Sequence, residues 1–161
     1  KAALPDAKIV VIVREPFARA VSHYRFSVQN GAETLDMAAA FTPEAEERSY
    51  ETARYSVSPF LYLKRGRYAD WLQPWVDVFG VSRVHVVVFE RLVAEPGTLA
   101  RIHRYLGVEE RAGTNREIVN PARGPIPELS ADRILDIRRS FAESNLRLSR
   151  MFGINLDLWA E

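Results

Sequence analysis

Arg14 and Ser22 are the residues whose types and spacing best suit the binding of an anion. Arg14 follows a short apolar run, and Pro16 opens a helical pattern directly afterwards. An Arg at the carboxyl end of a buried strand, just before a helix, presents a charged fork and unpaired backbone N–H groups to a ligand crevice. Ser22 lies about two helical turns further on and adds a hydroxyl donor. The two side chains therefore form a candidate clamp for a phosphate monoester.

The same spacing also fits a purely structural role for both residues. In that role Arg14 pairs with Glu15 or with a neighbouring helix, and Ser22 fills a small gap. Spacing alone does not separate the two interpretations.

Two strands and several helices are expected to position these residues. The runs KIVVIV (8–13) and RVHVVVF (83–89) are apolar and rich in β-branched residues, which is typical of parallel strands buried on both faces. Helical spacing and end signals predict helices over 16–29, 34–40, 43–53, 68–79, the stretch before Gly107 and, after a Ser130 cap, 131–152 with an interruption near Ser144-Asn145. The class is therefore α/β. Because two strands are too few for a free parallel sheet, we expect further strands before Lys1 or from a partner chain.

The remaining polar candidates favour structural roles. His23, His85 and His103 are scattered, and the sequence contains no Cys, so no metal-site spacing is present. Glu90 follows the second strand and is expected to cap the turn before the next helix. Tyr68 can reach a ligand, but it begins an apolar stripe that Trp71 and Trp75 share, and it is better explained by core packing.

A resemblance to a known family covers most of the chain in four ordered segments. The run from Arg14 through Ser22 to Tyr24 resembles the 3'-phosphate-binding segment of sulfotransferases that use 3'-phosphoadenosine 5'-phosphosulfate (PAPS). The other matching segments, similar to the carbohydrate, heparan-sulfate-type and bacterial members, are Gly66 to Phe79, Phe89 to Gly107, and Arg123-Gly124 through Asn145 to Trp159.

This resemblance implies a fold related to P-loop kinases and a nucleotide-binding transferase. Arg14 and Ser22 would hold the 3'-phosphate of PAPS, and Arg123 with the backbone of Gly124 would complete the grip. No metal is implied. The product would be 3'-phosphoadenosine 5'-phosphate (PAP), and the acceptor a hydroxyl or amine of a carbohydrate or small metabolite.

Two parts of the family pattern are absent from the sequence. The loop whose Lys stabilises the leaving phosphate and the catalytic base usually precede the strand found here at Lys8. We therefore interpret residues 1–161 as the carboxyl-terminal portion of a single sulfotransferase domain, inactive by itself. A kinase of related fold and a non-catalytic interaction module are the alternatives.

Composition limits the partners. The formal net charge is +1, which provides no overall field to recruit nucleic acid or a membrane surface. No apolar run approaches the roughly 20 residues of a membrane span. A cysteine-free chain rich in Ala and Arg favours a bacterial cytoplasm over the Golgi lumen, where several members of the family reside.

Overall fold

The fold is taken from a computed structural model that describes residues 6–110 and 128–159. The chain divides into two compact units. Unit 1 comprises Lys1–Glu15, Tyr68–Val119 and Ser144–Glu161, and unit 2 comprises Pro16–Arg67 and Asn120–Glu143. Each unit has a hydrophobic core of its own, so each is described by itself.

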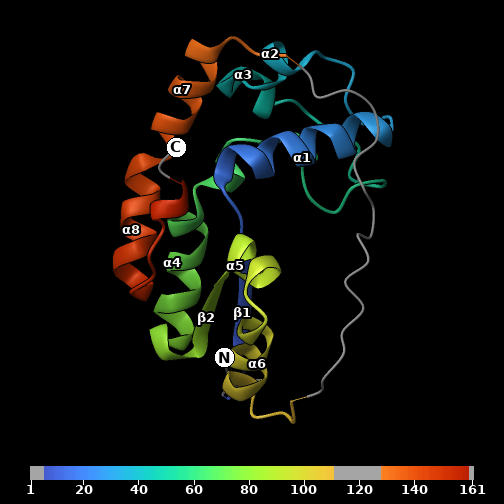
Figure 1. The fold of residues 1–161 in the computed structure, drawn as a ribbon. Coiled ribbons are helices and arrows are strands. Elements are labelled where there is room, and N and C mark those ends of the chain that lie inside the picture. Colours follow the sequence, from blue (N-terminus) through green and yellow to red (C-terminus); the bar gives the residue numbers. More distant parts are fainter. Residues whose placement is uncertain (1–5, 111–127, 160–161) are drawn as a thin grey trace. The chain divides into compact units, whose positions relative to one another are not determined.

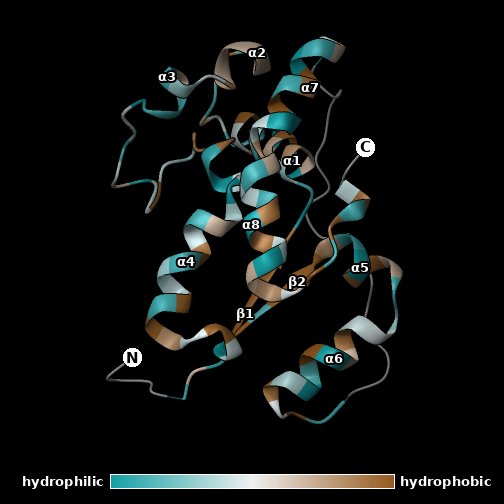
Figure 2. Ribbon diagram, turned by 90° about the vertical axis from the view of Figure 1, so that its left-hand side faces the viewer, coloured by the Kyte–Doolittle hydropathy of each residue, from teal (hydrophilic) through white to brown (hydrophobic). Residues whose placement is uncertain are grey.

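Unit 1 contains a parallel two-stranded sheet. Strand β1 (Ile9–Val13) pairs with β2 (Val84–Val88) in a register that runs from Ile9 opposite Val84 to Val13 opposite Val88. Both strands are largely brown in the hydropathy colouring of Figure 2, as expected of strands that pack on their faces. The two predicted strands and the predicted α/β class are thus confirmed.

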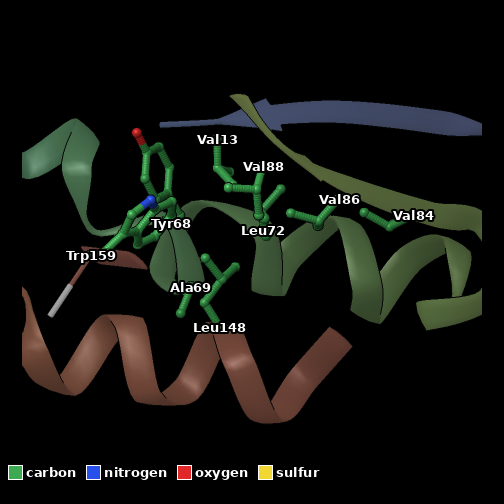
Figure 3. Packing of buried hydrophobic residues seen from close by; sticks show 9 residues of the cluster. All are labelled: Val13, Tyr68, Ala69, Leu72, Val84, Val86, Val88, Leu148 and Trp159. Carbon is green, nitrogen blue, oxygen red and sulfur yellow. The ribbon is translucent and has the colours of Figure 1, made fainter. Parts of the chain in front are cut away.

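Helices cover the sheet of unit 1. They are α4 (Tyr68–Phe79), α5 (Phe89–Ala94), α6 (Gly97–Leu106) and most of α8 (Ala142–Phe152), with short 3-10 turns at Val81–Arg83 and Asp157–Trp159. Leu72 of α4 and Leu148 of α8 pack with Val13 and the inward valines of β2 (Figure 3). Tyr68 and Trp159 close this core at the end where β1 finishes.

Unit 2 is helical over its described residues. It contains α1 (Pro16–Gln29), α2 (Met37–Ala40), α3 (Pro43–Glu46), a 3-10 turn at Lys64–Gly66 and α7 (Ala131–Ser140), and the α-helices are labelled in Figure 1. Its core is built from Ala20 and Tyr24 of α1, Phe41, Tyr62 and Phe141. Ser130 caps α7 by accepting the Arg133 N–H, as predicted.

The polar stretch after α1 differs from its prediction. Helices α2 and α3 are only one turn each, and the chain from Glu47 to Ala53 forms turns and irregular structure where the predicted helix over 43–53 was to continue. Side-chain caps from Asp36 and Thr42 fix both short helices. The core of unit 2 includes Met37, Ala40 and Phe41, so this stretch is packed more firmly than its composition indicates.

Two helix faces also differ from expectation. Helix α4 faces the sheet through Tyr68, Ala69 and Leu72, which leaves about half of Trp71 and of Trp75 exposed, although both were assigned to the buried stripe. The break in the last helical region falls at Phe141, earlier than Ser144. Phe141 is buried in the core of unit 2 and Leu148 in that of unit 1, so one helical pattern serves two cores.

Candidate functional site

The backbone of Arg14, directly after β1, is held by a single tyrosine. The Tyr68 hydroxyl donates to the Arg14 carbonyl at 2.8 Å and accepts the Arg14 N–H at 3.3 Å. The Tyr68 ring is 8% exposed and lies 6.2 Å from the Trp159 ring, centroid to centroid. The ring therefore belongs to the core, as predicted, while its hydroxyl fixes the turn that carries Arg14.

Glu90 holds the next residue of the same turn. Its Oε1 accepts the Glu15 N–H at 2.9 Å, and its Oε2 accepts the Trp159 indole N–H at 3.2 Å. The expectation that Glu90 caps the turn before the next helix is wrong, because its oxygens bond Glu15 and Trp159, and neither α5 nor α6 has a side-chain cap. Glu90 instead connects three segments that are far apart in the sequence, and this connection limits how far the turn can move.

The Arg14 side chain projects from a fixed turn. Its guanidinium carbon lies 5.2 Å from the centroid of the Phe89 ring, a distance at which a cation and an aromatic face attract each other. Among the described residues it forms no ion pair, neither with Glu15 nor with a residue of a helix. The purely structural role considered for Arg14 requires an ion pair with an acidic neighbour, and the described residues contain no such pair.

Ser22 belongs to unit 2, on a helix fixed by its other faces. Ala20 and Tyr24 of α1 are buried, and the Tyr24 hydroxyl donates to the Leu35 carbonyl at 2.8 Å. Ser22 itself is half-buried, and its hydroxyl makes no hydrogen bond within the described ranges. It is therefore available as a donor to a ligand.

His23, beside Ser22, is packed into unit 2. Its ring lies 4.9 Å from the Tyr62 ring in an edge arrangement. Burial, with smaller contributions from Arg19 and Arg65, lowers the pKa of His23 from 6.5 to about 4. His23 is thus neutral at pH 7, which agrees with the expected packing role.

A buried carboxylate organises the chain that follows α1. Both Glu33 oxygens bond the Arg48 guanidinium, Oε2 also accepts the Tyr62 hydroxyl at 2.9 Å, and Oε1 accepts the N–H groups of Thr34 and Leu35. Burial alone would raise the pKa of Glu33, but these hydrogen bonds lower it below the ordinary value. The network gives the unit that carries Ser22 a rigid polar centre.

The remaining candidate residues are Arg123, Gly124 and His85. Arg123 and Gly124 lie outside the described residues. His85 is half-buried and lies outside both hydrophobic cores; it stacks on Tyr105 with ring centroids 4.6 Å apart, and burial lowers its pKa. Within 6–110 and 128–159 no group of His, Asp and Glu is arranged to hold a metal ion, and no helix there is long and apolar enough to cross a membrane.

Sequence reasoning missed the pairing of Glu90 with Trp159. A carboxylate just beyond one strand end and an indole near the last residues carry no shared local pattern. The only signal was indirect, because a polar group at the carboxyl end of β2 must lie beside the turn that follows its parallel neighbour β1.

Comparison with known proteins now identifies the family. A model of the sulfotransferase family matches residues 1–112. The chain therefore belongs to the sulfotransferase family, and the resemblance noted in the sequence is confirmed.

Individual relatives agree with this assignment. Heparan sulfate glucosamine 3-O-sulfotransferase 6 of Mus musculus is 30% identical over 125 residues, which cover 74% of this chain and 33% of the relative. Heparan sulfate glucosamine 3-O-sulfotransferase 3B1 of the same species is 32% identical over 105 residues, which cover 65% of this chain and 25% of the relative. This chain thus spans about a third or less of the length of these curated relatives.

A solved structure matches the fold over almost the whole chain. The crystal structure of a sulfotransferase from Alicyclobacillus acidocaldarius superposes with a TM-score of 0.75 at 28% identity, covering 99% of this chain and 60% of the other. The fold is therefore that of a sulfotransferase, which agrees with the predicted α/β class.

Proposed function

We propose that this chain belongs to an enzyme that transfers the sulfuryl group of PAPS to a hydroxyl or amine. The acceptor oxygen or nitrogen forms a bond to sulfur, the bond from sulfur to the phosphate oxygen breaks, and PAP leaves while the acceptor loses its proton to a base. We assign neither that base nor the cation facing the leaving phosphate to a described residue. This chain's part is to hold the nucleotide.

Arg14 carries this proposal. Its backbone is bonded on both sides by the Tyr68 hydroxyl, and its guanidinium has no acidic partner among the described residues. A guanidinium held ready at the carboxyl end of a parallel strand suits a phosphate monoester, which offers several acceptor oxygens.

The other donors fit the same group. Ser22 supplies a hydroxyl that is free of described partners, and Arg123 with the Gly124 N–H would add a second guanidinium and a backbone donor. We assign these donors and Arg14 to the 3'-phosphate of PAPS, and their binding of this group would require no metal.

For the acceptor we propose a carbohydrate in preference to another small metabolite. The support is the chemistry named for the relatives, which sulfate glucosamine units of heparan sulfate. The loops that would choose among sugars contain no motif that selects one.

Calorimetric titration of the full-length protein with PAP tests the nucleotide site. We expect Arg14→Ala to weaken PAP binding by about 10- to 100-fold, since a hydrogen-bonded charge contributes roughly 1.5–3 kcal/mol. Ser22→Ala should weaken it less. Arg150→Ala is the matched control, because Arg150 is an exposed arginine of α8, and it should bind PAP like the wild type.

The same titration separates the alternatives. ATP binding as tight as PAP binding would favour a kinase, and PAP binding without sulfate transfer to any acceptor would favour a non-catalytic module. Equal PAP affinity in Arg14→Ala and Arg150→Ala would contradict the assignment of Arg14.

A further inference from the structure

A pocket of about 360 Å³ lies against β2 in unit 1, a volume within the range of ligand sites. We call it the edge pocket. It is lined by residues 85–88 of β2, by Arg91, Thr98 and Arg101 of α5 and α6, and by residues 153–155. All of these belong to unit 1, and neither Arg14 nor Ser22 is among them.

The edge pocket follows the side of β2 that faces away from β1. Successive side chains of a strand point to opposite faces of the sheet, so a cavity that touches four residues in a row lies along the edge of the strand. β1 occupies one edge of β2. Beyond that pairing, no described residue forms a backbone hydrogen bond with His85, Val86 or Val87. The outward N–H and C=O groups of β2 can therefore pair with a further strand.

The wall that α5 and α6 add to the edge pocket is positively charged. Arg91 and Arg101 line it, and in the described part of the chain their one acidic partner is Glu95, at 3.6 Å and 2.8 Å respectively. Glu95 does not line the pocket, and its side chain is 42% exposed, so water screens both ion pairs. Because two guanidinium groups share one carboxylate, this wall keeps an excess of positive charge.

Neutral groups hold the two arginines beside β2. Arg101 donates to the hydroxyl of Thr98 at 2.7 Å, and Thr98 is 5% exposed. Arg91 donates to the Asn155 carbonyl at 3.5 Å. A guanidinium has five N–H donors, so each arginine keeps donors for the carboxylate of a ligand.

An extended acidic peptide matches both features of the edge pocket. We propose that a segment of another protein adds a strand to the outer edge of β2 and directs acidic side chains to Arg91 and Arg101. A free inorganic anion would bind the arginines but leave the edge of β2 unpaired. A second copy of this chain, docked through its own β2, would bring the same two arginines, and like charges would oppose that contact.

Calorimetry of the full-length protein with designed peptides tests the charge requirement. The probe is a heptapeptide with blocked ends in which valine alternates with glutamate, and the comparison peptides have glutamine or lysine in place of glutamate. We expect the glutamate peptide to bind at least about 10-fold more tightly than the glutamine peptide, and the lysine peptide to bind least. Equal affinities of the three peptides would overturn the inference.

Arginine variants locate the binding of the glutamate peptide. Arg91→Gln and Arg101→Gln should each weaken it about 5- to 10-fold, the size expected for a charge-assisted hydrogen bond that is partly exposed. Arg104→Gln is the matched control, because Arg104 also lies on α6 and pairs with a carboxylate, that of Glu110, but does not line the pocket. Binding that is unchanged in both pocket variants, or reduced equally in the control, would contradict the site.

N-methylated peptides test the pairing with β2. Alternate residues of a strand direct their N–H groups to opposite edges, so methylating every valine nitrogen blocks one edge of the glutamate peptide and methylating every glutamate nitrogen blocks the other. We expect one isomer to bind like the parent and the other to lose at least about 10-fold in affinity. Two isomers that bind alike would show that the arginines bind acidic groups without a new strand.

A titration with the glutamate peptide in saturating PAP separates this inference from the proposed function. The peptide should bind equally well with and without PAP, because no lining residue of the edge pocket is assigned to the nucleotide. Displacement of the peptide by PAP would place it on the nucleotide site and overturn the docking site. Peptide binding that meets the tests above in a protein that does not bind PAP would support the docking site while the proposed function fails.

Discussion

Tyr68 places one hydroxyl between the N–H and the carbonyl of Arg14, while its ring remains in the core of unit 1. Glu90 holds the following residue by one bond, in which its carboxylate accepts the Glu15 N–H. Neither side chain needs to touch a ligand. Both determine the direction in which Arg14 leaves the strand, so they act as positioning residues.

Replacing Tyr68 with Phe tests this role at the residue scale. The variant keeps the ring but leaves the Arg14 carbonyl and N–H without their partner, which costs about 1–3 kcal/mol when the groups are buried. We expect PAP affinity to fall about 5- to 10-fold, measured by calorimetry, together with a lower free energy of unfolding.

Tyr105→Phe is the control for that experiment. The buried Tyr105 hydroxyl has no hydrogen-bond partner among the described residues, so its removal should change neither the free energy of unfolding nor PAP binding by much. Indistinguishable PAP affinities in the two variants would show that the Tyr68 hydroxyl does not position Arg14.

The sequence predicted Arg14 at a strand end and the Tyr68 ring in a core, because both follow from local patterns. It did not predict the hydroxyl of Tyr68 on Arg14, which joins positions 54 residues apart, or Glu90 on Trp159, which are 69 apart. Such contacts depend on how the strands pair, and the hydrophobic periodicity of the sequence does not indicate them.

At the scale of elements, the 3-10 turn at Lys64–Gly66 is shaped by a close approach. A Cβ built on Gly66 would lie 2.7 Å from Phe141 Cε1 and 3.2 Å from Pro16 Cβ. Pro16 and Phe141 are almost completely buried, so neither has room to move away. The turn, the start of α1 and the end of α7 therefore pack together only with glycine at this position.

Gly66→Ala tests this packing. We expect a loss of about 1–3 kcal/mol in the free energy of unfolding, the usual cost of overfilling a core, measured by urea titration. Gly97→Ala is the matched control, because its Cβ would meet only Arg101 at 3.6 Å and alanine favours a helix. A Gly66→Ala variant as stable as the control would refute the close approach.

The prediction of helices and strands was correct where an apolar pattern packs into a single core. The strands and α1, α4 and α6 follow their apolar runs and their Pro or Gly boundaries. It failed for 47–53, because α3, which begins at the Thr42 cap, ends at Glu46 and the chain continues in turns. It also misplaced Trp71 and Trp75, because an apolar stripe does not tell which part of it faces the sheet.

At the scale of the whole molecule, the described residues build two separate cores. Leu148 is fully buried in the core of unit 1, and Ile137 is 3% exposed in the core of unit 2. All three Trp residues, Trp71, Trp75 and Trp159, belong to unit 1, so tryptophan fluorescence reports that unit.

Leu148→Ala and Ile137→Ala test whether these cores unfold separately. Each substitution should cost about 2–5 kcal/mol. We expect Leu148→Ala to lower hydrogen-exchange protection in β1, β2 and α4 and to shift the fluorescence midpoint, and Ile137→Ala to act on α1 and α7. Equal losses in both units for both variants would mean that the cores unfold as one.

The contacts around the turn at Arg14 also bear on synthesis. Residues 14, 15, 68, 90 and 159 meet there, so they span nearly the whole described chain. A nascent chain made only as far as β2 contains Arg14 and Tyr68, but neither Glu90 nor the Trp159 indole that donates to Glu90. The contacts that fix this turn are therefore complete only after residue 159 has been made, and products that terminate between Tyr68 and Glu90 lack the Glu90 contacts even though they contain Arg14.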